Sequence, residues 1–269
     1  MIDLVISGAA GRMGQAIART ALAAGDIRIV GALGASDRPY LGKDIGDLVG
    51  VGHTGVPITS DRTSVPTVGT VWLAFSTPDA TMAHARHAIT AGAAIVVGTT
   101  GLSQEQITEL SGLAHKAPVI IAPNTSLGAN VLFFLAETAA RALGSTFDIE
   151  IVEAHHRLKR DAPSGTARRL AERIATARDQ AIDAVARFGR APDAGRREHG
   201  EIGVHAVRAG DIVGEHTALF ADIGERLELT HRVGSIDTFA RGALLAARFL
   251  HGRTPGLYTM EQALGLVSV

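Results

Sequence analysis

The residues of this sequence whose types and spacing could perform chemistry are concentrated in one segment, residues 153–166. Two adjacent histidines, His155 and His156, follow a short apolar run, and Lys159 comes soon after them. A histidine can donate or accept a proton near neutral pH, and a neighbouring lysine can bind a carboxylate or act as a second acid. A single histidine more often has a packing role, so it is the combination in one loop that indicates proton-transfer chemistry.

The same segment continues into the start of a helix that could hold an anion. Ser164, Gly165 and Thr166 open a basic, amphipathic run with helical periodicity. N–H groups at a helix start have no partner within the helix, and with the two hydroxyl groups they form a site for a carboxylate. The histidine and the lysine can share a pocket with this site only if the loop turns back on itself, which Pro163 and Gly165 favour.

Near the N-terminus, a glycine-rich turn has a spacing typical of a phosphate-binding motif. Glycines at positions 8, 11 and 14 follow an apolar strand and open a helix. Glycine lets the backbone approach a pyrophosphate closely, and the helix start stabilises its charge. Ala10 replaces the middle glycine of the usual fingerprint, and a glycine turn alone also fits a purely structural role. The predicted cofactor-binding residues of this turn are Gly8, Ala9, Ala10, Gly11, Arg12 and Met13.

The second predicted strand ends without the acid that usually binds the adenine ribose. Gly34 occupies the expected acidic position, and Asp37 comes slightly later. Without a carboxylate at this position, the 2′-phosphate of NADPH is not repelled there. Ser36, Arg38 or Arg12 could bind this phosphate. We therefore expect NADPH to be used at least as well as NADH, although Arg38 fits equally a flexible loop that makes no ribose contact.

Hydrophobic patterning predicts the elements that must position these motifs. In the first half of the chain, the predicted strands are 4–7, 27–33, 71–75, 94–97 and 119–122, and the predicted helices are 12–24, 78–91 and 104–115. The stretch 34–68, rich in Gly, Pro, Asp and Ser, is only weakly patterned. Strands alternating with helices of this length are typical of βαβ units, so we expect a doubly wound parallel sheet.

Two loops follow strands of this predicted sheet at the edge where ligands bind in such architectures. They could present backbone and hydroxyl groups to the nicotinamide end of a dinucleotide, although each alone also fits an ordinary turn. The predicted cofactor-binding residues of these loops are Gly98, Thr99 and Thr100, and Ala122, Pro123, Asn124 and Thr125.

The pattern changes after about residue 127 and predicts a second domain. A long helical run at 128–143 precedes a strand at 148–154. Strands at 202–207, 211–220 and 226–232 are joined by short glycine-containing turns, which indicates an antiparallel meander. A last helix covers 237–250, with Ser235 as its N-cap. We expect a nucleotide-binding domain of residues 1–126 and 236–269, and an α+β domain of residues 127–235 with a mixed, largely antiparallel sheet.

Composition argues against several classes of function. The 26 basic and 27 acidic side chains give a net charge of −1, which leaves no positive surplus to hold nucleic acid or an anionic membrane. The absence of cysteine excludes disulfides, thiolate metal sites and cysteine nucleophiles. His84 and His87 share a helix without an evident third ligand, so no metal site is expected. The N-terminus is typical of a strand rather than a signal peptide, and we expect a cytoplasmic protein.

Together these segments resemble the 4-hydroxy-tetrahydrodipicolinate reductase family, also called dihydrodipicolinate reductases, of the diaminopimelate route to lysine. The matching stretches span nearly the whole chain: residues 8–14, 98–101, 122–124, 153–156 with Lys159, 161–167, 200–203, 208–216 and 239–243. The His-His-x-x-Lys loop followed by Asp-Ala-Pro-Ser-Gly-Thr is the most specific of them. Gly34 departs from the pattern, since many relatives have an acid there.

The resemblance implies a Rossmann-like N-terminal domain, a second domain that binds substrate and assembles a homotetramer, and no metal. In such enzymes hydride from C4 of the nicotinamide of NADH or NADPH adds to a conjugated cyclic imine. Water is lost from the hydroxylated precursor, a small cyclic dicarboxylate. The resemblance further implies that His155 donates or accepts a proton and that Lys159 is a second proton donor. The implied substrate-binding residues are His156, Ser164, Gly165 and Thr166.

Alternatives share the fold but not the chemistry. A dehydrogenase of the aspartate-semialdehyde type is excluded because it needs a thiol nucleophile. A homoserine-type dehydrogenase does not explain the His-His-x-x-Lys loop. A non-catalytic NAD(P)-sensing regulator would keep the glycine turn without the chemistry, and the presence of both His155 and Lys159 argues against it.

Overall fold

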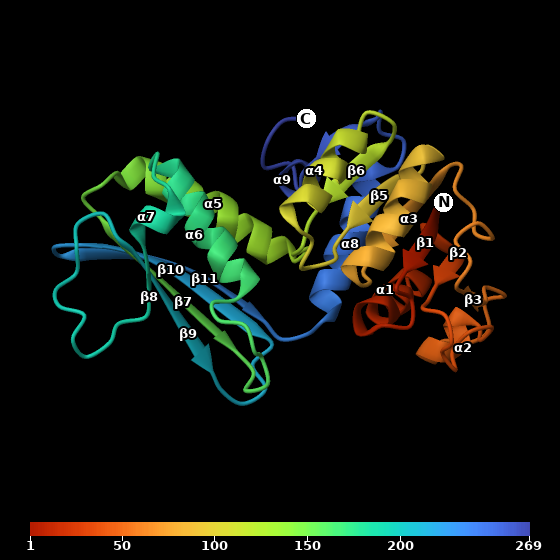
Figure 1. Ribbon diagram of the computed structural model, residues 1–269, viewed down its shortest axis with the longest axis horizontal. Helices are drawn as coiled ribbons and strands as arrows, with labels where there is room; N and C mark the ends of the chain where they lie inside the picture. The colour runs from red at the N-terminus through yellow and green to blue at the C-terminus, as the bar shows by residue number, and fades with distance from the viewer. The chain divides into compact units, whose positions relative to one another are not determined.

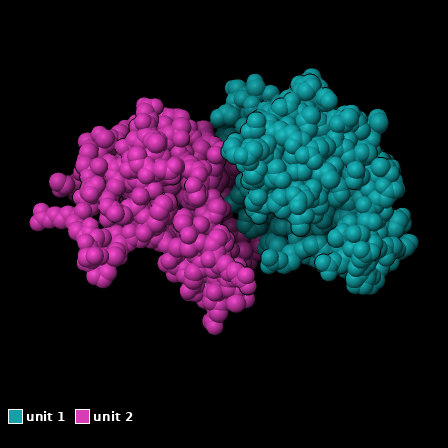
Figure 2. Space-filling view, in the orientation of Figure 1, with its two compact units in different colours: residues 1–127, 236–269 teal, residues 128–235 magenta.

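The computed structural model describes residues 1–269, which form two compact units (Figures 1 and 2). Unit 1 comprises residues 1–127 and 236–269, shown in teal in Figure 2, and unit 2 comprises residues 128–235, shown in magenta. Unit 2 is therefore inserted into the chain of unit 1. No helix in either unit has the length and apolar character that a membrane span requires.

Unit 1 is built on a seven-stranded sheet with the order β12-β6-β5-β4-β1-β2-β3, in which every pair of neighbouring strands is parallel. Its strands are β1 (Ile2–Ser7), β2 (Ile27–Leu33), β3 (Ile58–Thr59), β4 (Thr70–Ala74), β5 (Ala94–Val97), β6 (Pro118–Ile121) and β12 (Gly256–Tyr258). The chain order reverses between β1 and β4, which is where such sheets bind ligands. The expected doubly wound parallel sheet is confirmed.

Helices cover both faces of this sheet because successive residues along each buried strand point to opposite sides. One hydrophobic cluster joins β1 and β4 to α1 and α8, and a second joins β4 and β5 to α3 and α4. The helices of unit 1 are α1 (Arg12–Leu22), α2 (Ile45–Val49), α3 (Pro78–Thr90), α4 (Gln104–Leu113), α8 (Asp237–Leu250) and α9 (Met260–Ala263). Helix α4 starts with a capping box of Ser103 and Gln106. Helix α8 has Ile236 rather than Ser235 at its N-cap position.

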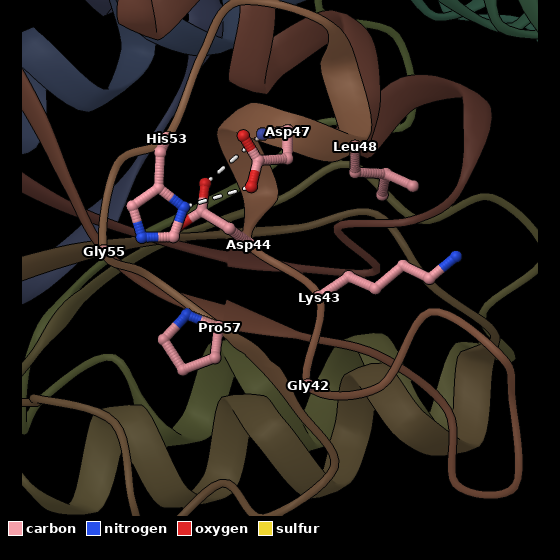
Figure 3. A pocket seen from close by; sticks show the side chains of 8 residues that line it. All are labelled: Gly42, Lys43, Asp44, Asp47, Leu48, His53, Gly55 and Pro57. Carbon is pink, nitrogen blue, oxygen red and sulfur yellow. Dashed lines mark hydrogen bonds and ion pairs between the residues drawn. The ribbon is translucent and has the colours of Figure 1, made fainter.

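The weakly patterned stretch 34–68 is organised around the carboxylate of Asp44, at the start of α2. Asp44 Oδ1 accepts hydrogen bonds from the N–H groups of Gly46 at 2.8 Å and Thr54 at 3.0 Å, and Oδ2 accepts one from Val56 N–H at 2.8 Å. Burial alone would raise the pKa of Asp44, but these hydrogen bonds hold it far below its ordinary value. Figure 3 shows His53 beside this carboxylate in a pocket. The hydrogen bonds of Asp44 therefore hold this stretch in its conformation.

Unit 2 contains a five-stranded sheet with the order β11-β10-β7-β9-β8. Its strands are β7 (Asp148–His155), β8 (Ala186–Phe188), β9 (Ile202–Arg208), β10 (Gly214–Asp222) and β11 (Glu225–Val233). Helices α5 (Leu127–Leu143) and α6 (Gly165–Ala177) pack their apolar residues on one face, beside the short helix α7 (Ile182–Val185). Strand β7 is antiparallel to β10 but parallel to β9. The expected mixed sheet is confirmed.

The predicted meander of three consecutive strands is wrong. Only β10 and β11 form a hairpin, because β7 lies between β9 and β10. The short connection from β9 to β10 passes the end of β7, where Ala209 N–H donates to His155 O at 2.9 Å and Arg157 N–H donates to Gly210 O at 3.1 Å. Alternating apolar residues predict that a strand exists, but they do not specify which strand pairs with it.

Candidate active site

A fully buried carboxylate, Glu153, organises the segment that contains the predicted catalytic histidine. Glu153 Oε2 accepts hydrogen bonds from His155 Nδ1 at 2.6 Å and Arg208 Nη1 at 2.8 Å. Its Oε1 accepts bonds from the N–H of Ser164 at 2.9 Å and from Arg208 Nη2 at 2.7 Å. Burial alone would raise the pKa of Glu153, but the bonds from Arg208, His155 and Ser164 outweigh it and lower the pKa. Glu153 is therefore ionised near neutral pH.

The partners of this carboxylate come from different strands that the sheet places side by side. Glu153 and His155 lie two residues apart on β7 and so share one face. In the register of the sheet, Arg208 at the end of β9 is opposite His155, and His216 on β10 is opposite Glu153. The central position of β7 thus brings all four side chains together.

His155 is arranged to exchange a proton through one ring nitrogen. Its Nδ1 faces Glu153, so the favoured tautomer has Nδ1–H donating to the carboxylate and leaves Nε2 for proton exchange. Gly214 lies next to Nε2, where an added Cβ would be 3.2 Å from that nitrogen. Burial lowers the pKa of His155, while Glu153 opposes this effect, and the net shift is downward.

His216 forms a wall of the same site. Its ring packs edge-on to His155 with 5.2 Å between centroids, and its Nε2 lies 3.0 Å from Ser164 Oγ. Burial, together with the charge of nearby His155, lowers the pKa of His216 to about 3, so this ring stays neutral at physiological pH. The sequence alone does not place His216 in this site, because the spacing along the chain gives no sign that β10 pairs with β7.

The loop after β7 turns back on itself, as the sequence analysis required. Arg208 Nη2 donates to Asp161 O at 2.6 Å, and the bond from Ser164 N–H to Glu153 brings the start of α6 beside β7. The Ala162–Pro163 peptide bond within this loop is cis. Lys159 Nζ donates to Asp161 Oδ1 at 2.8 Å, which places the ammonium group on the loop.

The start of α6 has the features of an anion site. Ser164 is its N-cap, its Oγ accepts a bond from Ala167 N–H at 3.2 Å, and no acidic residue occupies the first turn. Gly165 is exposed, and Thr166 and His156 are half-buried. The Ser164 hydroxyl is buried between the helix and His216, so it supports the helix start rather than facing solvent.

The glycine turn of unit 1 fits the diphosphate of a dinucleotide. Gly8 has a φ of +84°, and an added Cβ would lie 2.1 Å from Phe75 O, so only glycine fits. An added Cβ at Gly14 would lie 2.1 Å from Gly8 O, so glycine also allows α1 to approach the end of β1. Helix α1 starts at Arg12 with no side-chain cap on Gly11 and no acid in its first turn. These features leave the helix start available to an anion.

The two other predicted cofactor loops lie side by side, and Ala122 N–H donates to Val97 O at 2.8 Å. Their buried hydroxyl groups have structural partners. Thr99 Oγ1 lies 2.6 Å from Thr81 Oγ1, and Thr125 Oγ1 donates to Phe239 O at 2.8 Å. These two hydroxyls hold the loops in place, which leaves the main chain and the exposed residues Thr100 and Pro123 for contact with a ligand.

Glu153, Arg208 and His216 had no assigned role in the sequence analysis. The spacing Glu-x-His on a predicted strand was the one available signal, since it puts both side chains on one face. Arg208 and His216 become visible only through the pairing of β9 and β10 with β7.

Comparison with known proteins matches both units. Residues 2–125 match the family model "Dihydrodipicolinate reductase, N-terminus", and residues 128–264 match "Dihydrodipicolinate reductase, C-terminus". A 4-hydroxy-tetrahydrodipicolinate reductase from Nitrosomonas europaea is 46% identical over 265 residues, which is 98% of each chain. One from Syntrophus aciditrophicus is 42% identical over 268 residues and 100% of each chain.

Solved structures agree with these matches. The dipicolinate-bound dihydrodipicolinate reductase from Paenisporosarcina sp. TG-14 superposes with a TM-score of 0.74 at 26% identity, over 96% of this chain and 97% of that one. An amine dehydrogenase from Mycobacterium smegmatis has a TM-score of 0.60 at 17% identity, over 97% and 95% of the two chains, and shares the fold alone. The active-site geometry, the two-unit fold and the full-length matches agree, and the chain belongs to the dihydrodipicolinate reductase family.

Proposed function

We propose that this chain reduces 4-hydroxy-tetrahydrodipicolinate to tetrahydrodipicolinate, with loss of water, in the diaminopimelate route of lysine biosynthesis. The observation that carries this function is the contact of Glu153 with His155, Arg208 and the start of α6, which puts a proton-exchanging histidine beside an anion site. Full-length relatives named as 4-hydroxy-tetrahydrodipicolinate reductases support the same activity. The intact Glu153–His155 pair argues against a non-catalytic NAD(P)-sensing role.

NADH or NADPH, which this family uses, supplies a hydride from C4 of its nicotinamide when bound. The residues of unit 1 that we propose to hold it are Gly8, Ala9, Ala10, Gly11, Arg12 and Met13 in the glycine turn, and Gly98, Thr99, Thr100, Ala122, Pro123, Asn124 and Thr125 in the two loops. The diphosphate would bind to N–H groups at the start of α1. Thr99 and Thr125 would contribute their main chain, because their hydroxyl groups bond elsewhere.

Unit 2 would hold the substrate and supply protons. The main chain of Gly165 and Thr166, at the start of α6, and the nearby side chain of His156 are suited to a carboxylate, and Ser164 fixes the helix start. The relative with bound dipicolinate, an aromatic ring dicarboxylate, supports this ligand class. Lys159 adds a positive charge on the same loop and is the second proton donor.

His155 moves the proton that the reaction requires at the ring. Reduction of a conjugated imine adds one proton for each hydride, and departure of a hydroxyl group as water also needs an acid. Nε2 of His155 can give this proton while Nδ1–H remains bonded to Glu153. The carboxylate stabilises the charged imidazolium against the effect of burial.

We further propose that unit 2 assembles a homotetramer through the face of its sheet that α5 and α6 leave uncovered. Val152 and Val207 lie on this face, with 40% and 44% of their surfaces exposed, and a partner surface over this face would remove both side chains from water. Sedimentation velocity at micromolar concentration should give the mass of four chains, and a monomer would contradict the assembly.

Replacement of His155 by Gln should decrease kcat by ~10²–10⁴-fold, because the proton donor is lost, while the Kd for NADPH stays nearly unchanged. The assay is NADPH oxidation coupled to the synthase that makes the hydroxylated ring. His115→Gln, in the exposed turn after α4, is the matched control and should retain wild-type kcat. An unchanged kcat in His155→Gln would refute the assigned role.

Replacement of Lys159 by Ala should raise KM for the substrate and lower kcat, because charge near the substrate carboxylates and a proton donor are removed together. Arg160→Ala, on the exposed side of the same loop, controls for a general loss of positive charge. A change confined to the Kd for NADPH would place Lys159 outside the substrate site.

Replacement of Glu153 by Gln should lower the apparent pKa of His155 in the pH dependence of kcat/KM. Burial lowers the pKa of His155 and the Glu153 carboxylate raises it, so removal of the carboxylate charge lets the pKa fall further. Glu150→Gln is the matched control, since Glu150 lies on β7, accepts a bond from His205 Nε2 at 2.6 Å, and points to the opposite face. An apparent pKa that shifts equally in both variants, or in neither, would contradict the effect of the Glu153 carboxylate on His155.

A further inference from the structure

The first residue after β2 has no room for a side chain. An added Cβ on Gly34 would lie 2.5 Å from Tyr40 Cε2 and 3.0 Å from Ile58 Cγ2. The φ of Gly34 lies outside the left-handed region, so other residues could adopt this backbone conformation. Packing against the ring of Tyr40 therefore requires glycine here.

The ring of Tyr40 is held in place from several sides. Its hydroxyl accepts a hydrogen bond from Ala35 N–H at 3.1 Å, and its ring packs on the hydrophobic cluster of β1, α1 and α8. The main chain is tied as well, since Lys43 N–H donates to Tyr40 O at 3.1 Å. A larger residue at position 34 thus cannot displace the ring at low cost.

Gly34 lies beside the glycine turn. Leu33 O accepts hydrogen bonds from the N–H groups of Gly8 and Ala9, both at 2.9 Å, so the end of β2 touches the turn. In sheets of this type, the residue at the end of the second strand places a carboxylate on the adenine ribose. In this chain the ring of Tyr40 fills the space that such a side chain would need.

Exposed arginines on the two segments that meet at the end of β2 favour a phosphate. The guanidinium groups of Arg12, at the start of α1, and Arg38, in the loop after β2, are exposed and make no hydrogen bond or ion pair. Guanidinium groups bind phosphate through several N–H donors. Asp37 is the one carboxylate between Gly34 and Tyr40, and it is exposed.

We propose that Tyr40 determines cofactor choice: its ring excludes the ribose-binding carboxylate, and the site selects the 2′-phosphate of NADPH over the free 2′-hydroxyl of NADH. This inference rests on the proposed NAD(P)H-dependent reduction and deepens it by naming the residue that sets specificity. The side chain of an acid introduced at position 34 alone would collide with the ring of Tyr40.

Binding of adenosine fragments tests the inference without catalysis. Calorimetric titration should show that the wild-type chain binds adenosine 2′,5′-bisphosphate at least about tenfold more tightly than adenosine 5′-monophosphate, because a charge-assisted contact to phosphate is strong. The Asp37→Asn variant should still bind the bisphosphate more tightly than the monophosphate. Equal binding of the two fragments by the wild type would overturn the inference.

Substitutions at both positions test the role of the ring. Gly34→Asp alone should weaken both fragments and lower the unfolding temperature, without preference for the monophosphate. Gly34→Asp with Tyr40→Ser should invert the preference, because the carboxylate gains the space of the ring. Gly34→Asp with Tyr40→Phe keeps the ring and should behave like Gly34→Asp. The inference would be overturned if Gly34→Asp alone preferred the monophosphate as strongly as Gly34→Asp with Tyr40→Ser does.

The coupled enzyme assay separates this inference from the proposed function. A wild-type chain that reduces the substrate but has a higher kcat/KM with NADH contradicts the role of Tyr40 and leaves the activity standing. A chain that discriminates between the two fragments but oxidises neither cofactor contradicts the activity and leaves the fragment selectivity standing.

Discussion

The ionised carboxylate of Glu153, buried within the sheet of unit 2, is the constraint on which the active site depends. A buried charge is unfavourable unless it is paired and hydrogen-bonded, and Glu153 draws its donors from β9, the start of α6 and its own strand. Each donor therefore has to be in place for the others to be stable. The same contacts orient His155 and bring the start of α6 beside it, so one electrostatic requirement positions both the proton donor and the anion site.

Much of unit 1 could be predicted from the sequence because its signals are local. Strands β4 and β5 are buried on both faces and appear as continuous apolar runs, and the capping box of Ser103 marks the start of α4. Unit 2 was less predictable, since its strands pair out of chain order. The residues of β9 and β10 do not indicate that β7 lies between these two strands. The weakly patterned stretch before β4 folds around Asp44, whose partners are mostly main-chain groups and leave no pattern of side chains.

The site shows the same division between local and long-range information. The segment with His155, Lys159 and the start of α6 could be identified because it is continuous in sequence. Arg208 and His216 could not, because they reach it only through strand pairing. Gly34 illustrates the point at a single position: the sequence reveals that an acid is missing, but only the packing of Tyr40 explains why none fits.

The insertion of unit 2 into unit 1 has a consequence for biosynthesis. Helix α8 contributes Ala243, Leu244 and Leu250 to the cluster that covers one face of the parallel sheet, yet it follows unit 2 in the chain. During translation, strands β1 to β6 therefore leave the ribosome long before the helix that completes their core. The part of this sheet face that α8 covers, beside α1, stays open for that interval, and exposed apolar surface promotes aggregation. The nascent chain should need chaperone protection until α8 emerges and docks.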